Sequence, residues 1–124
     1  MILELTKGDP KNGVTLIHMK GSIHTGPDCR RVEHEVEKLI AAGEVRVIFD
    51  MAAVTHIDSA AIGSIVRSLS NLKKAGGGLR LAGATGMIAS SFKLTKLDRI
   101  VPLFPSVAEA SENFSSAAPP PGNK

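Results

Sequence analysis

Apolar residues follow two patterns along this chain, and the pattern changes where glycine, proline and small polar residues cluster. Short aliphatic runs predict strands, and apolar stripes at helical spacing predict helices. A first strand is expected over residues 2–6 and a second over residues 14–20. The turn-forming residues 7–13 between them favour a hairpin or a meander.

A helix is expected next, from Pro27 to about Gly43. Proline suits a first helical position, Asp28 favours the positive end of the helix dipole, and glycine suits the position after the last turn. The residues of its apolar stripe are Cys29, Val32, Val36, Leu39 and Ile40.

The middle of the chain reads as strand, loop, helix and strand. Residues 45–49 are nearly continuously apolar, as in a central buried strand, and residues 52–57 are expected to form a connecting loop. A second helix should begin near Asp58 and stop at glycines 76–78, before a strand at residues 79–82. Its apolar stripe consists of Ala61, Ile62, Ile65, Val66, Leu69 and Leu72.

The last part of the chain contains shorter elements. A helical piece is expected at residues 88–94, and a strand at 100–104 must lie at a sheet edge because Pro102 cannot donate a ladder hydrogen bond. A capping-box pattern opens a terminal helix over residues 106–114. The Pro- and Ser-rich tail, residues 115–124, is expected to be disordered.

These elements predict an α/β fold, a mixed β-sheet of about four to five strands with about four helices packed on it. It would form one domain over residues 1–114. A chain of 124 residues buries a core without metal or disulfides, and one cysteine excludes an intramolecular disulfide. Because this Cys29 lies on an apolar stripe, we expect a buried, unreactive thiol.

The balance of charged residues and the N-terminal sequence limit which classes of function the chain can have. Lys and Arg outnumber Asp and Glu by only 15 to 12, and no basic run is interleaved with aromatic residues, so nucleic-acid binding is not expected. The N-terminal segment lacks the pattern of a signal peptide, and no apolar stretch approaches the roughly 20 residues that span a bilayer. We therefore expect a cytoplasmic protein without membrane insertion.

No catalytic centre, metal site or cofactor site is indicated. His, Cys, Asp and Glu residues lack the spacing of paired metal ligands, and no Walker or Gly-x-Gly-x-x-Gly motif is present. His56, Asp58 and Ser59 are residue types of a catalytic triad, but they are nearly adjacent, and a triad needs the His oriented between the other two. The sequence favours a protein that binds another protein, not an enzyme.

The most informative segment runs from Phe49 to Ser64, where a central strand ends and a helix begins. Functional groups gather at such strand ends in open α/β sheets. Asp58 is a helix-capping residue type, but capping does not account for Ser59, which falls opposite the apolar stripe. A polar face at helical spacing consists of Ser59, Gly63, Arg67, Ser70 and Lys74.

This segment resembles the STAS family, specifically the bacterial anti-sigma factor antagonists. Those proteins have a strand ending in Asp, a loop, and Asp-Ser-(Ser or Thr)-Gly opening a helix; here the strand reads VIFDMAAV and the helix opens IDSAAIGSIVRSL. The segments AGGGLRLAG and TKLDRIVPLFPSVAEA are similar to later family elements, so the likeness extends from about Val14 to Phe114. Ala60 replaces the second hydroxyl residue of the pattern, and Ala61 replaces its glycine.

The resemblance implies a protein that binds an anti-sigma factor serine kinase and frees the sigma factor, until the kinase phosphorylates Ser59 and releases it. A phosphatase acting on that serine would be a further partner. A phosphate adds about −1.5 to −2 charges, which a close interface beside Asp58 would disfavour. The residues expected to bind the partner are Asp58, Ser59, Gly63, Arg67, His24, Thr55 and His56.

Two other functions stay open at this point. A STAS scaffold or adaptor, in a signalling assembly or with a membrane transporter, would remain bound whatever the state of Ser59. A small-molecule-binding STAS domain would need a deep pocket, and the sequence offers no polar constellation for one.

Overall fold

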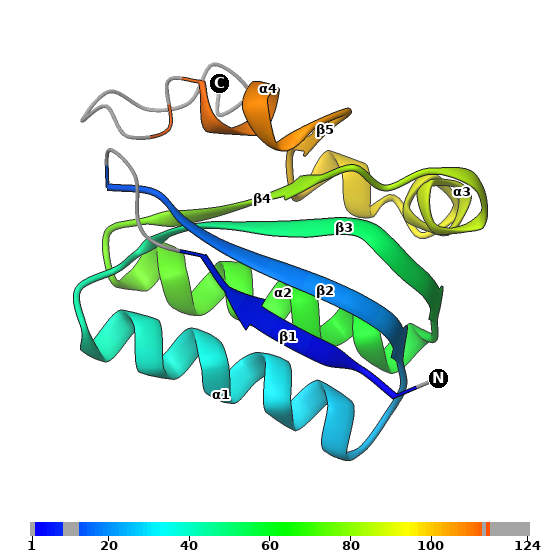
Figure 1. Cartoon of the computed structure of the whole chain (residues 1–124), viewed down its shortest axis with the longest axis horizontal. Helices are drawn as coiled ribbons and strands as arrows, with labels where there is room; N and C mark the ends of the chain where they lie inside the picture. Colours follow the sequence, from blue (N-terminus) through cyan, green and yellow to red (C-terminus); the bar gives the residue numbers. More distant parts are fainter. Residues whose placement is uncertain (1, 9–12, 113, 115–124) are drawn as a thin grey trace.

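The computed structural model describes residues 2–8, 13–112 and 114, which form an α/β fold (Figure 1). Its elements in chain order are β1 (Glu4–Lys7), β2 (Thr15–Ile23), α1 (Pro27–Ala41), β3 (Arg46–Ile57), α2 (Ser59–Lys74), β4 (Gly78–Ala82), α3 (Gly86–Leu94), the 3-10 helix η1 (Leu97–Arg99), β5 (Leu103–Phe104) and α4 (Val107–Ser111).

The five strands form one sheet in the order β1-β2-β3-β4-β5. β1 is antiparallel to β2 and the other neighbouring pairs are parallel, so the predicted mixed sheet is confirmed. α1 and α2 lie side by side on one side of the sheet, and α4 lies on the other side (Figure 1). The buried residues of α3 belong to the same core as those of α1 and α2. Because β2, β3 and β4 are parallel, the loops after their carboxyl ends meet at one edge of the sheet.

The main core lies between the sheet and the pair of helices α1 and α2. It is largely aliphatic, with Phe49 and Phe92 as its aromatic members. Fully burying one large apolar side chain contributes about 1.5–3 kcal/mol, so this layer holds both helices on the sheet. The predicted stripe residues that are buried in it are Cys29, Val32, Val36, Leu39, Ala61, Ile65, Leu69 and Leu72.

A smaller core lies under the carboxyl-terminal segment, where Phe114 and Ala110 pack against Ile48. Arg80 of β4 is buried beside it, at 1% exposure. Its Nη1 donates hydrogen bonds to the carbonyl oxygens of Ala110 at 2.8 Å and Glu112 at 2.7 Å. Burial lowers the pKa of the Arg80 guanidinium, which is held by carbonyl oxygens and not by a carboxylate among the described residues.

Two aromatic rings complete the environment of Arg80. The guanidinium carbon lies 4.3 Å from the ring centroid of Phe114 and 5.2 Å from that of Phe104. Such cation–π contacts are each worth about 0.5–2 kcal/mol, more when they are desolvated. The Arg80 side chain of β4 therefore holds the carboxyl-terminal segment with α4 against the sheet through hydrogen bonds and ring contacts.

The prediction of a loop over residues 52–57 is wrong, because β3 continues as a strand to Ile57. Beyond Asp50 this strand no longer pairs with β4, but it still pairs with β2, which runs to Ile23 and not only to Lys20. Register shifts interrupt that pairing and so obscure the period-two pattern in the sequence. The β-branched residues of the segment favour the extended strand.

Smaller differences concern the ends of elements. β5 covers only Leu103–Phe104 of the expected 100–104, and it pairs with β4 at the sheet edge, as Pro102 predicted. α4 ends at Ser111, earlier than expected. The tail over residues 115–124 lies outside the described residues. None of the described helices is both long and apolar enough to cross a membrane.

Candidate functional site

The candidate site lies where β3 ends and α2 begins. Asp58 is extended and caps α2, whose first residue is Ser59. The Asp58 Oδ1 accepts a hydrogen bond from the Ala61 amide at 2.9 Å, and its Oδ2 accepts one from the Thr25 amide at 2.8 Å. One carboxylate therefore fixes the start of α2 against the loop between β2 and α1. The cap forms with Ala61 in place of glycine.

The Asp58 carboxylate is held in its charged form. Burial alone would raise its pKa, but hydrogen bonds from the Ala61 and Thr25 amides and the nearby His24 lower that pKa below its ordinary value of 3.8. The Nδ1 atom of His24 lies 3.9 Å from Asp58 Oδ2. At neutral pH a negative charge therefore stands directly before Ser59.

His24 lies in the loop after β2, and the fold brings it to the candidate site. Its backbone amide donates to the Oδ2 atom of Asp28 at 3.0 Å, so the first turn of α1 holds the loop in place. Its imidazole is exposed beside Asp58. Two carboxylates, from Asp28 and Asp58, thus flank this end of the sheet.

Ser59 is exposed in the first turn of α2, on the side away from the core, as predicted. Two other serines of the helix differ from it, because Ser64 is 1% and Ser68 is 0% exposed. The Ser64 hydroxyl donates to the carbonyl oxygen of Cys29 at 3.2 Å. A modifying enzyme can therefore reach the Ser59 hydroxyl in the folded protein, whereas the hydroxyls of Ser64 and Ser68 are covered.

Arg67 and Gly63 extend the exposed face along α2. The Arg67 Nε and Nη2 atoms donate to Glu33 Oε2 of α1, at 3.1 and 2.9 Å. This hydrogen-bonded pair lowers the pKa of the Glu33 carboxyl. A Cβ atom at Gly63 would meet only Arg67 Nη1, at 3.5 Å, so packing within the domain does not require a glycine there.

Thr55 and His56 are exposed near the end of β3. The Thr55 Oγ1 atom lies 3.4 Å from Ser22 Oγ and 3.2 Å from His56 Nδ1. Among the described residues, no hydrogen bond joins His56 to Asp58 or Ser59, so these three side chains do not form the bonded chain of a triad. Thr55 and His56 share the edge of the sheet with the other candidate residues but belong to a separate cluster.

Cys29 lies beneath this edge, where its Sγ donates to the His24 carbonyl oxygen at 3.3 Å. Burial raises the pKa of the thiol, which disfavours the reactive thiolate, and the predicted buried cysteine is confirmed. Within residues 2–8, 13–112 and 114, no three His, Cys, Asp or Glu side chains gather as metal ligands.

Two contributors to the site were missed in the sequence. Thr25 acts through its backbone amide, which nearly any residue supplies. Glu33 is one of several acidic residues on α1, and nothing in its spacing identifies it as the partner of Arg67. Asp58 carries a readable signal, because Asp before an apolar helical stripe is a capping residue.

Comparisons with known proteins relate this chain to a described family. The family model of the STAS domain matches residues 9–110. A protein of Thermotoga maritima, named as a candidate anti-sigma factor antagonist, is 29% identical over 76 residues, which cover 61% of this chain and 67% of that protein.

Solved structures share the fold. A candidate anti-sigma factor antagonist of Thermotoga maritima gives a TM-score of 0.77 at 22% identity, covering 90% of this chain and 93% of that one. The anti-sigma factor antagonist SpoIIAA of Bacillus gives TM-scores of 0.65 unphosphorylated and 0.66 phosphorylated, at 13% and 14% identity. These matches cover 86% of this chain and 91% and 96% of the SpoIIAA chains. At such identities the likeness establishes the fold.

Proposed function

This chain belongs to the STAS domain family, and from that premise we propose that it is an anti-sigma factor antagonist, which binds an anti-sigma factor serine kinase and is released when the kinase phosphorylates Ser59. The named relatives support the general role. The observation that carries the switch is the exposed Ser59 hydroxyl at a firmly capped helix start. The protein acts by binding, not by catalysis, and this role places it in the cytoplasm.

Phosphorylation at Ser59 would change the surface and leave the fold intact. The phosphate would add about −1.5 to −2 charges next to the Asp58 carboxylate. The positive end of the α2 dipole offsets part of that repulsion in the free protein. In an interface, both anions would have to lose water, and a cost of about 3 kcal/mol already weakens binding roughly a hundredfold.

The site of modification is testable with purified components. Each candidate anti-sigma factor kinase of the source organism is incubated with the protein and ATP, and the phosphopeptides are mapped by mass spectrometry. We expect phosphate on Ser59 and none on the buried Ser64 and Ser68. Modification of Thr55 or Ser70, which are also exposed, would assign the switch to another residue.

Calorimetry with the kinase so identified tests the effect on binding. Ser59→Asp should bind about tenfold more weakly or worse, and Ser59→Ala should bind but resist release by ATP. Ser70→Asp is the matched control, because it adds the same charge to an exposed position of the same helix. If the phosphorylated protein keeps full affinity, the adaptor function replaces the switch. A phosphatase that restores Ser59 would complete the cycle.

A further inference from the structure

Three of the four large apolar side chains that are exposed in the described residues lie in one short segment. Met87 and Leu94 of α3 are 71% and 83% exposed, and Ile100, which follows η1, is 50% exposed. The fourth, Ile2, is at the start of the chain. Exposed apolar side chains that concentrate in one place mark interaction sites more often than scattered ones do.

Met87 and Leu94 share one face of α3, because seven residues complete about two helical turns. Another face of the same helix carries Ile88 and Phe92, which are buried in the main core. A surface helix needs only one apolar face for its own fold. The face with Met87 and Leu94 therefore has no role in the packing of the described residues.

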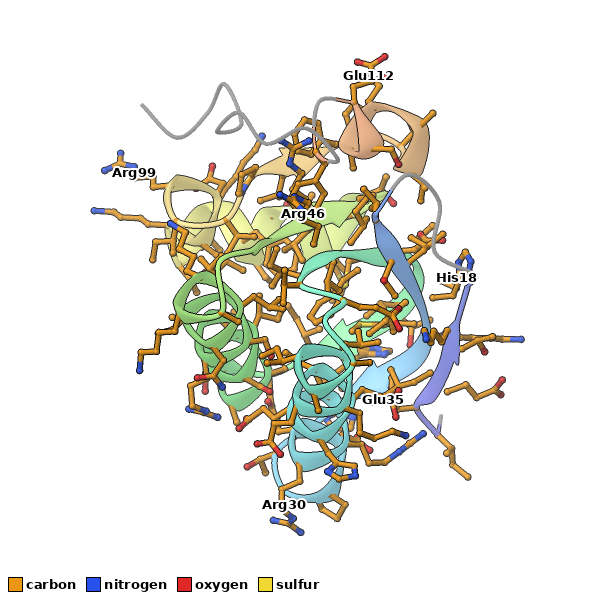
Figure 2. All side chains as sticks on the ribbon, turned by 90° about the vertical axis from the view of Figure 1, so that its left-hand side faces the viewer. His18, Arg30, Glu35, Arg46, Arg99 and Glu112 are labelled. Carbon is orange, nitrogen blue, oxygen red and sulfur yellow. The ribbon has the colours of Figure 1, made fainter. Side chains whose placement is uncertain are left out.

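The charged residues of this segment are mostly basic. Among the described residues, none of the exposed side chains of Lys93, Lys96, Asp98 and Arg99 enters an ion pair, and Asp98 is the one acid. Figure 2 shows Arg99 extending away from the body of the molecule. The group that we call the α3 surface consists of Met87, Lys93, Leu94, Lys96, Arg99 and Ile100.

The α3 surface lies toward the same edge of the sheet as Ser59. α3 follows the carboxyl end of β4 and α2 follows that of β3, and the two strands are parallel neighbours (Figure 1). The approach of the β4–α3 connection to β3 is close, since a Cβ atom at Gly83 would lie 3.1 Å from that of Ala52. Ser59 belongs to the first turn of α2, and it is not one of the residues of the α3 surface.

We propose that the α3 surface is a docking site for the serine kinase, and that it meets an apolar patch edged by Asp and Glu side chains. The identity of the partner rests on the proposed function; the chemistry of the patch rests on the exposed apolar residues and their uncompensated positive charge. Because Ser59 lies outside this surface, docking here supplies affinity that does not depend on phosphorylation. Ser59 then modulates a complex that α3 helps to hold.

Two other occupants fit less well. In a twofold contact between copies of this chain, the mostly basic α3 surface would face an identical surface, and the like charges would disfavour the contact. A membrane-bound helix needs a continuous apolar face, whereas Ser90 and Ser91 lie between Met87 and Leu94 on α3.

Peptide probes test the chemistry of the surface without the kinase. The full-length, isotope-labelled protein is titrated with two synthetic amphipathic helices that share a leucine face, one edged by Glu and the other by Lys. We expect the Glu-edged peptide to shift the backbone amide signals of α3, and the Lys-edged peptide to bind about tenfold more weakly or worse. Equal affinities, or shifts confined to other elements, would overturn the proposal.

Charge reversal tests the role in kinase binding. The double variant Lys93→Glu/Lys96→Glu and the single variant Leu94→Ser should each weaken kinase binding about tenfold, and by the same factor for the phosphorylated and unphosphorylated protein. The matched control is Lys73→Glu/Lys74→Glu, two exposed lysines in the last turn of α2, which should stay within about twofold. Thermal midpoints check that every variant folds.

The outcomes separate the two proposals. An effect of Ser59→Asp without an effect of the α3 variants overturns the docking site and leaves the switch. An effect of the α3 variants without an effect of Ser59→Asp overturns the switch and leaves the docking site. Light scattering and sedimentation with phosphatidylglycerol vesicles complete the test: a dimer or a vesicle-bound fraction that Leu94→Ser abolishes would assign the α3 surface to self-association or to lipid instead.

Discussion

The carboxylate of Asp58 accepts a hydrogen bond from the amide of Thr25 at 2.8 Å, through the oxygen that does not cap α2. The residue before the candidate phosphorylation site therefore joins the start of α2 to the loop between β2 and α1, which is distant in the sequence. Its charge is part of the fold as well as part of the surface that a partner meets.

Replacing Asp58 tests its structural role. Asp58→Ala removes both acceptors and should lower the free energy of unfolding by about 1 kcal/mol, within the range of 0.5–2 kcal/mol known for helix caps. Asp58→Asn keeps a capping oxygen and should lose less. Urea denaturation measures both; equal stability of Asp58→Ala and the wild type would show that the cap contributes nothing.

The same residue predicts a dependence on pH. The pKa of Asp58 is lower in the folded protein than its ordinary value of 3.8, so the stabilisation by the carboxylate is complete above that pH and is lost as the pH falls through the folded-state pKa. Asp58→Asn lacks this contribution. Thermal unfolding between about pH 6 and pH 2 should show the wild type losing stability more steeply in acid than Asp58→Asn.

Gly63 offers a test that separates folding from binding. Gly63→Ala should stabilise the domain by up to about 1 kcal/mol, because alanine favours a helix interior and its Cβ would meet only Arg67 Nη1, at 3.5 Å. It should nevertheless weaken kinase binding if the partner approaches the α2 backbone there. Gly77→Ala is the contrasting variant: its Cβ would collide with the Val45 carbonyl oxygen, so it should destabilise the domain.

Arg80 provides a test of the carboxyl-terminal layer. Arg80→Ala removes the donor to the Ala110 and Glu112 carbonyl oxygens and both ring contacts, and should cost about 3 kcal/mol of stability. Arg80→Met retains apolar contact with the rings and avoids a buried charge, so its loss should be smaller. If Arg80→Ala unfolds in urea like the wild type, the contacts of Arg80 with the carboxyl-terminal segment contribute nothing to stability.

The boundary of the domain at residue 114 is a further prediction. A chain that ends at Phe114 should keep its thermal midpoint within a few degrees, because the Pro-rich tail lacks apolar periodicity. A chain that ends at Glu112 also loses the buried Phe114 ring and should unfold at a clearly lower temperature. Equal midpoints for the two truncations would place the boundary before Phe114.

Local signals in the sequence were sufficient to predict where α2 starts and which of its first residues is exposed. The capping Asp58, the buried stripe and the exposed Ser59 all follow from residue type and helical spacing, and the structure has them as predicted. Long-range contacts were not accessible in this way. Arg80 reads as an ordinary strand residue, because the rings and carbonyl oxygens that surround it come from residues 104–114.

The extent of β3 could not be predicted for a similar reason. A strand that pairs on both sides gives a continuous apolar run, as residues 47–49 do. Beyond Asp50 the strand pairs with β2 alone, across register shifts, and its buried residues Met51 and Val54 are three positions apart, which does not match the period of two of a strand. Alanine-rich composition at 52–53 then resembles a loop.

The position of Ser59 on a capped helix, with its side chain outside the core, has a consequence for genetics. Substitutions there should leave abundance, solubility and thermal midpoint close to normal, since no buried contact is lost. A screen that scores variants by expression or heat resistance will therefore not distinguish them from the wild type. Under the proposed function, their defects would emerge only in an assay of gene expression, where a signal that is never switched off, or never switched on, is visible.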